Sequence, residues 1–335
     1  MQKNDKGITL KLGGKCNLKC KHCHNAIIDY DLNPDLIPWL KKNNFSRIFF
    51  SGGEPTLYFD LIKKIVIEIG HNTKYGLVTN ATLLTDEMIN FFNLYNVSVV
   101  VSYDGLSSQR DFSYIPNYRK MKDIKYRGLT SVFYRQNGDL FKLSREIKNF
   151  QFKYWNEEDD SSFYPNFVHQ TKLSPNDDVD KFLAQKYASQ YGPLLELDFL
   201  NLKKDKNVTH LNVLKNAFRN WREEKKYQGV ACFNEKSISV SISGNFLVCP
   251  YNPETNIGNI YHDINWKKVE EYFPERCSTC KIRNICKCIC VENITENECY
   301  IAKVMYKHMC KLMNKYRYSY DELFKIIMSN KAGEK

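Results

Sequence analysis

Residues 7–25 read GITLKLGGKCNLKCKHCHN, an apolar run that leads directly into a loop with three cysteines. The alternation over residues 7–12 predicts a β-strand. Cys16, Cys20 and Cys23 follow, separated by three and two residues. Three soft sulfur ligands on one loop can hold three corners of an iron-sulfur cube, which leaves one iron open for a small molecule. A structural zinc ion would need a fourth protein ligand, so a zinc knuckle and three buried thiols are the weaker alternatives.

The other cysteines gather near the opposite end of the chain. Of 12 cysteines, none lies between residues 24 and 231, and nine lie between residues 232 and 310. A zinc ribbon built on Cys277 and Cys280 would leave most of these without a role. The polar start, MQKNDKGITL, has no apolar signal stretch, which predicts a reducing cytoplasm where thiols stay available for metal.

Both cysteine sets resemble those of a known family. The loop of Cys16, Cys20 and Cys23 resembles the signature of radical S-adenosylmethionine (SAM) enzymes, in which the amino and carboxylate groups of SAM fill the open iron site. The second set resembles the SPASM extension of radical SAM maturases, and all seven cysteine positions of that extension are filled. The cofactors implied by the resemblance are SAM and three 4Fe-4S clusters, one that binds SAM and two auxiliary ones.

The resemblance also implies the auxiliary ligands. The first auxiliary cluster would take Cys232, Cys249 and Cys290, and the second Cys277, Cys280, Cys286 and Cys299. No cysteine lies between Cys232 and Cys249, where some relatives carry an extra ligand. The first auxiliary cluster would therefore have an open iron, unless Cys288 or Cys310 fills it.

Apolar patterns predict an α/β fold in which strands alternate with helices. After the first strand, further strands are expected at residues 46–51, 75–79, 97–102, 131–135 and 163–168. An apolar stripe over residues 61–69 predicts a helix. Six such units match the partial (β/α)6 barrel of the radical SAM family, followed by a small C-terminal iron-sulfur module.

We expect four parts: the barrel over residues 1–171, a helical connection over 172–230, the SPASM domain over 231–310 and a tail over 311–335. In the third part, SISVSISGNFLVCP (237–250) predicts a hairpin that turns at Ser243 and Gly244. Such a hairpin would present Cys249 at a strand end, beside Cys232.

Four motifs follow expected strands, at the end of a barrel where chemistry is usually placed. They are Gly52, Gly53, Glu54 and Pro55; Thr79 and Asn80; Ser102, Tyr103, Asp104 and Gly105; and Arg135. By resemblance, the GGEP run contacts the amino group of SAM, and Asn80 lies in the segment after the third strand. Ser102 and Asp104 would lie near the cofactor or substrate, and Arg135 would bind the carboxylate of SAM.

Local structure offers another explanation of each motif. GGEP suits a tight turn, Thr85 or Asp86 after Asn80 suits a helix cap, Asp104 with Gly105 suits a turn, and Arg135 suits the surface.

The resemblance implies that one-electron reduction of the first cluster cleaves SAM and that the resulting radical takes a hydrogen atom from an unactivated carbon. The auxiliary clusters would accept the electron lost when a bond forms. We therefore predict a maturase that installs a carbon-carbon, ether or thioether crosslink in a ribosomally made precursor peptide, with flavodoxin or ferredoxin as electron donor. The sequence does not identify the catalytic base.

Three alternatives stay open. Sulfatase-type protein maturation shares the architecture, but relatives carry an aspartate where Pro250 follows Cys249 here. A peptide epimerase would need a hydrogen-donating thiol, for which Cys288 and Cys310 are candidates. An iron-sulfur scaffold or electron carrier would leave GGEP, Asn80 and Asp104 unused.

Charge and length add limits. The net charge of +11 comes from scattered Lys and Arg without an RNA-binding signature, which favours a solvated surface over nucleic acid. The sequence contains no run of about 18 uncharged apolar residues, so we predict no transmembrane helix. Because the chain starts almost at the first strand, we expect no N-terminal winged-helix domain for peptide recognition.

Overall fold

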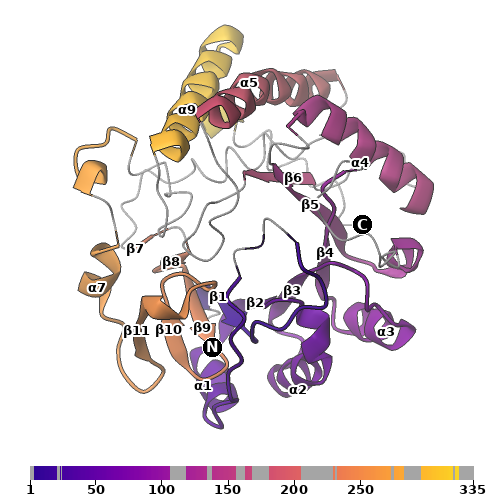
Figure 1. Cartoon of the computed structure of the whole chain (residues 1–335), viewed down its shortest axis with the longest axis vertical. Coiled ribbons are helices and arrows are strands. Elements are labelled where there is room, and N and C mark those ends of the chain that lie inside the picture. Colours follow the sequence, from indigo (N-terminus) through magenta and orange to yellow (C-terminus); the bar gives the residue numbers. More distant parts are fainter. Residues whose placement is uncertain are drawn as a thin grey trace.

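The computed structural model describes residues 4–20, 23, 25–105, 118–133, 138–155, 163–167, 181–204, 229–230, 232–272, 275–282, 296–319 and 321–323. Six parallel strands form the body of one curved sheet (Figure 1). They are β1 (Asn4–Lys11), β2 (Phe45–Ser51), β3 (Lys74–Thr79), β4 (Ser98–Ser102), β5 (Arg127–Phe133) and β6 (Phe163–Phe167). Each strand pairs with the next in chain order, and the sheet is open, as expected for a partial barrel.

Helices lie outside the curve of the sheet (Figure 1). The α-helices before residue 205 are α1 (Leu36–Asn43), α2 (Phe59–Ile69), α3 (Asp86–Leu94), α4 (Leu140–Trp155) and α5 (Lys181–Lys204). Short 3-10 helices are η1 (Pro55–Tyr58) and η2 (Tyr118–Asp123). The alternating pattern predicts an α-helix between β4 and β5, but the described residues there form the 3-10 helix η2.

Helix α2 shows why these segments fold as they do. Its residues Phe59, Ile62, Ile65 and Val66 fall on one face and are buried against the sheet. Burying a side chain of this kind contributes about 1.5–3 kcal/mol. The apolar stripe predicted over residues 61–69 is therefore confirmed as a helix.

The expected strands are confirmed, with one displacement. The fifth strand was predicted at residues 131–135 but lies at Arg127–Phe133. Its register is set by β4, because Val99 pairs with Arg127 and Ser102 with Thr130. Pairing with a neighbour therefore decided the bounds of this strand, which local composition did not reveal.

The C-terminal hairpin joins the same sheet. Strand β9 (Ser237–Ser241) pairs in parallel with β1, from Gly7 opposite Ser237 to Lys11 opposite Ser241. Strands β10 (Asn245–Leu247) and β11 (Asn256–Asn259) continue the sheet in antiparallel fashion. The predicted hairpin is confirmed, and Gly244 has a φ of +87°, which favours glycine.

The remaining elements complete the C-terminal half. They are β7 (Gly229–Val230), β8 (Phe233–Asn234), η4 (Pro253–Thr255), α7 (Trp266–Glu270), η5 (Glu275–Cys277) and α9 (Glu296–Tyr316). Helix α9 lies beside α5 (Figure 1) and crosses the boundary expected at residue 310. The division into four parts stays a prediction. No helix in the described part of the chain is long and apolar enough to cross a membrane.

Candidate functional site

The first three cysteines lie on the loop that leaves the carboxyl end of β1. Cys16 and Cys23 are exposed and Cys20 is half-buried, and no disulfide joins them. The backbone N–H of Leu18 donates to Cys16 Sγ at 3.4 Å, and that of Cys23 donates to the Cys20 carbonyl at 3.1 Å. An N–H directed at sulfur favours the thiolate, the form that binds metal.

Among the described residues, no three His, Cys, Asp or Glu side chains lie close enough together to hold a metal ion. Cys16, Cys20 and Cys23 therefore stay a predicted ligand set. Their shared loop, their exposure and the donor aimed at Cys16 are what fits an iron-sulfur cluster with one open iron.

The GGEP segment packs directly against this loop. Gly53 N–H donates to the Gly13 carbonyl at 3.0 Å, and Glu54 N–H donates to the Lys15 carbonyl at 2.8 Å. A Cβ at Gly53 would overlap the Lys15 carbonyl oxygen, so this close approach of two backbones requires glycine. The tight approach serves the cysteine loop, and the predicted contact of Gly52 and Gly53 with SAM stays untested.

Glu54 is only 1% exposed, and its carboxylate accepts four hydrogen bonds. Oε1 accepts from Thr56 N at 3.1 Å, Thr56 Oγ1 at 2.6 Å and Thr79 Oγ1 at 2.7 Å. Oε2 accepts from Asn80 N at 2.8 Å. Burial raises the pKa of Glu54, and these hydrogen bonds oppose the rise. Glu54 thus ties the end of β2 to the end of β3 beneath the cysteine loop.

Asn80 reaches the cysteine loop from β3. Its Nδ2 donates to Asn17 Oδ1 at 2.9 Å and lies 4.0 Å from Cys16 Sγ. Its Oδ1 accepts from Thr82 N at 3.0 Å, while Asn17 Nδ2 donates to Thr82 Oγ1 at 2.7 Å. Asn80 is therefore part of a closed amide network that holds the residue beside Cys16.

Ser102 and Asp104 lie at the same edge of the sheet, after β4. Ser102 is half-buried, whereas Asp104 is fully buried and its Oδ1 accepts from Val132 N at 2.8 Å. Gly105 has a φ of +82°, as expected for the turn. Asp104 thus joins the ends of β4 and β5. Arg135 lies outside the described residues.

The described C-terminal cysteines occupy four segments. Cys249 is buried after β10, in a turn where its N–H donates to Thr255 Oγ1 at 2.9 Å. Cys232 precedes β8, and its carbonyl accepts from Ser239 Oγ at 3.0 Å. Cys277 and Cys280 share a turn closed by a 3.3 Å backbone hydrogen bond. Cys299 lies on α9, and Cys286 and Cys290 lie outside the described residues.

Lys11, the last residue of β1, lies where the two cysteine-bearing loops meet. Its side chain is only 1% exposed. Its Nζ donates to Asn25 Oδ1 and lies 5.2 Å from the centroid of the Tyr251 ring. Burial lowers the pKa of Lys11 to about 8, and negative charge on Cys23 and Cys249 opposes that decrease.

Tyr251, two residues after Cys249, connects the same two loops. Its carbonyl accepts from Ala26 N at 3.3 Å. Burial raises its pKa to about 12, and negative charge on Cys232, Cys249 and Cys23 adds to the rise. Thiols from both ends of the chain therefore act on one side chain, so the first loop and the Cys232 and Cys249 turns are neighbours.

Several of these site residues were not predicted. They are Lys11, Asn17, Asn25, Thr56, Tyr58, Thr82 and Tyr251. Tyr58 accepts from Lys15 N at 3.0 Å and donates to Asp29 Oδ1 at 3.3 Å, which steadies the loop from η1. For Lys11 the sequence did offer a signal, because a lysine within the apolar run GITLKL is a charge at a strand position that is expected to be buried.

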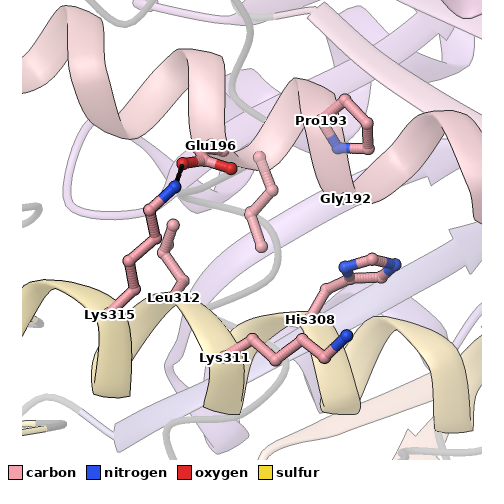
Figure 2. A pocket seen from close by; sticks show the side chains of 8 residues that line it. Gly192, Pro193, Glu196, His308, Lys311, Leu312 and Lys315 are labelled. Carbon is pink, nitrogen blue, oxygen red and sulfur yellow. Dashed lines mark hydrogen bonds and ion pairs between the residues drawn. The ribbon is translucent and has the colours of Figure 1, made fainter.

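A separate pocket of about 280 Å³ lies between α5 and α9 (Figure 2). Figure 2 shows His308 and Lys311 of α9 facing Gly192 and Pro193 of α5. Across the gap, Lys315 Nζ pairs with Glu196 Oε1 at 2.5 Å. No cysteine lines this pocket, so it is distinct from the cysteine site.

Comparison with known families assigns the first domain. Residues 10–127, which run from the end of β1 into β5, match the Radical SAM superfamily. The strands β2 to β4 and the three-cysteine loop after β1 lie within this match. The chain thus contains a radical SAM domain, and this superfamily implies SAM and a 4Fe-4S cluster as cofactors.

Solved structures resemble nearly the whole chain. Native anSMEcpe with bound AdoMet is 18% identical, has a TM-score of 0.64 and aligns over 93% of this chain and 99% of its own. Streptococcus suis SuiB bound to precursor peptide SuiA is 17% identical, with a TM-score of 0.58 over 85% of this chain and 71% of its own. These likenesses show that the C-terminal half shares their fold too.

A curated relative is the radical SAM cyclopropyl synthase TigE of Paramaledivibacter caminithermalis. It is 26% identical over 222 residues, which is 58% of this chain and 42% of TigE. The chain spans about two fifths of the length of the first curated relatives that it matches.

Proposed function

We propose that this chain is a radical SAM maturase that crosslinks a ribosomally made precursor peptide. One observation carries the proposal: the three-cysteine loop after β1 and the turns of Cys232 and Cys249 meet at Lys11 and Tyr251. A crosslink needs removal of a hydrogen atom at one centre and of an electron at another. Two neighbouring cysteine sites suit that pair of tasks.

The proposed cofactor site has three parts. Cys16, Cys20 and Cys23 would hold the first cluster, which with SAM supplies a radical able to take a hydrogen atom. Gly52, Gly53 and Glu54 support the loop, and Asn80 holds its first part through Asn17. Ser102, Asp104 and Arg135 are proposed to complete the SAM or substrate surface. Asp104, which is buried, joins the ends of β4 and β5 at this edge of the sheet.

The auxiliary ligands stay as the cysteine pattern predicts. Cys232, Cys249 and Cys290 would hold one cluster, and Cys277, Cys280, Cys286 and Cys299 a second. The peptide substrate is supported by relatives only: SuiB was solved with a precursor peptide and anSMEcpe with the Kp18Cys peptide. TigE, a cyclopropyl synthase, supports bond formation. A flavodoxin or ferredoxin is the proposed electron donor.

The first experiment tests SAM cleavage. Anaerobically reconstituted protein should form 5'-deoxyadenosine from SAM, and the Cys16→Ala, Cys20→Ala, Cys23→Ala triple variant should form none. Cys288→Ala is the control, because Cys288 is not among the expected ligands of the first cluster. Persistent 5'-deoxyadenosine in the triple variant would refute the assignment of the loop.

The second experiment tests the product. Incubation with candidate precursor peptides encoded near this gene, followed by tandem mass spectrometry, should reveal a product that lacks two hydrogens. Cys277→Ala should keep SAM cleavage but stop product formation, since a closed four-cysteine site loses its cluster when one ligand is removed. An unchanged mass with solvent deuterium incorporated would indicate epimerisation instead.

Sulfatase-type protein maturation is the other candidate. The likeness to anSMEcpe over almost the whole of both chains is compatible with it, but Pro250 occupies the position where an aspartate was expected. A sulfatase-derived peptide offered under the same conditions should stay unmodified.

A further inference from the structure

Lys11 is a buried cation without an acidic partner in the described structure. Lysine is almost never fully buried unless it is paired, because an ammonium ion loses its hydration. No described carboxylate forms an ion pair with Lys11. Its contacts are the Asn25 amide and the face of the Tyr251 ring, and it ends the strand that leads into the three-cysteine loop. Burial lowers its pKa and negative charge on Cys23 and Cys249 raises it, so the thiolates of metal-bound cysteines could balance its charge.

We propose that Lys11 is a fixed positive charge that raises the reduction potential of the cluster bound by Cys16, Cys20 and Cys23, and that it positions this loop against the Cys249 turn. The proposal rests on the proposed cluster, but not on the peptide or the bond formed. Lys11 is a positioning residue and no part of it need touch SAM or substrate.

The electrostatic part follows from charge and burial. Adding an electron makes a cluster with thiolate ligands more negative, so a nearby cation stabilises the reduced state more than the oxidised state. Burial of Lys11 strengthens this effect because a buried charge is screened less by salt and water than an exposed one. Lys11 occupies such a position, because it is buried at the end of the strand that leads into the three-cysteine loop.

The positioning part follows from two chains of contacts. Lys11 Nζ holds Asn25, whose Nδ2 lies 3.5 Å from the Gly14 carbonyl at the start of the loop. Next to it, Ala26 N–H donates to the Tyr251 carbonyl, while the Tyr251 ring covers Lys11. One ammonium group thus fixes both ends of the loop and the turn after Cys249. Groups beyond the metal ligands commonly tune such sites in this way.

The test compares two neutral replacements of Lys11. Lys11→Met keeps length but loses charge and hydrogen bond, and Lys11→Gln keeps a donor but loses charge. Reconstituted proteins would be compared by iron and sulfide content and by redox titration followed with electron paramagnetic resonance. The first cluster is identified by the change in its signal when SAM is added. We expect a more negative midpoint potential in both variants.

Lys6→Met is the matched control. Lys6 lies on the same strand but is exposed, and it precedes Lys11 by five positions, about 17 Å along a strand. Its loss changes net charge equally and should leave the potential unchanged. An unchanged potential in Lys11→Met and Lys11→Gln with clusters bound would overturn the proposal, as would an equal shift in Lys6→Met.

Lys11→Arg makes the test decisive if the neutral variants fail to assemble a cluster. If both neutral variants bind no iron while Lys11→Arg binds it, the positive charge is required and the proposal is supported. If all three bind no iron, Lys11 serves packing alone and the proposal fails. Wild-type protein that binds no cluster would instead refute the proposed function.

Discussion

Replacing Glu54 by alanine should destabilise the protein strongly, although no ligand is involved. The change removes the acceptor of two buried backbone donors, Thr56 N–H and Asn80 N–H. Each unsatisfied buried donor costs about 1–3 kcal/mol, so the pair costs about 2–6 kcal/mol. The substitution also removes the cost of burying a carboxylate, which offsets part of this loss of stability. We expect the free energy of unfolding to fall by about 2–4 kcal/mol.

Urea unfolding of the cluster-free protein under reducing conditions measures this loss. Glu68→Ala is the matched control, because Glu68 makes an exposed ion pair with Lys41 at 3.0 Å, worth about 0–1 kcal/mol. Glu54→Gln should fall between the two, since its amide can keep the contacts of Oε1 but places an NH2 group against Asn80 N–H. Equal unfolding midpoints for Glu54→Ala and Glu68→Ala would refute the reasoning.

Three further predictions use the same assay. Burial raises the pKa of Glu54, so the folded state holds this proton more tightly than the unfolded state does. The stability that comes from this proton is complete below the usual pKa of 4.5 and is lost as pH rises through the raised value. Glu54→Gln should lack this pH dependence, and identical pH profiles would contradict it. Gly53→Ala should lower the free energy of unfolding by about 1–3 kcal/mol or more, because the new Cβ overlaps the Lys15 carbonyl. Gly7→Ala is the control and should be tolerated, because the nearest neighbour of its Cβ is the Arg47 side chain at 3.5 Å. Thr85→Ala should cost about 1 kcal/mol, because Thr85 Oγ1 accepts from Met88 N at 3.2 Å as the N-cap of α3, and a loss near zero would argue against the cap.

The barrel half could be predicted because its signals are local. Apolar strand runs, the stripe of α2 and the Thr85 cap are written in neighbouring residues, and the structure confirms them. Motifs after parallel strands also had to meet at one edge of the sheet. That rule brought the GGEP segment and Asn80 to the cysteine loop.

The roles of individual motif residues could not be predicted from position alone. Glu54 and Asp104 were expected near the cofactor or substrate, which stays a prediction; the structure shows in addition that both carboxylates are buried and accept hydrogen bonds from backbone N–H groups at the ends of adjacent strands. A carboxylate after a strand suits either role in sequence. The sequence does not reveal which carboxylate is buried. For Glu54 the structure does, because Gly53 next to it packs against the backbone of the cysteine loop.

The pairing of β9 with β1 depends on residues more than 220 positions apart, which no local pattern reveals. Alternation in SISVSISGNFLV predicts a strand, but several strand edges could accept it. The observed register sets Lys11 opposite Ser241, eight residues before Cys249. Because a slip of one residue would turn every β9 side chain to the other face, this register fixes how the Cys249 turn meets the first loop. The spacing of the two cysteine sites is therefore a property of the rigid sheet, and Lys11 lies at the strand end where that spacing is set.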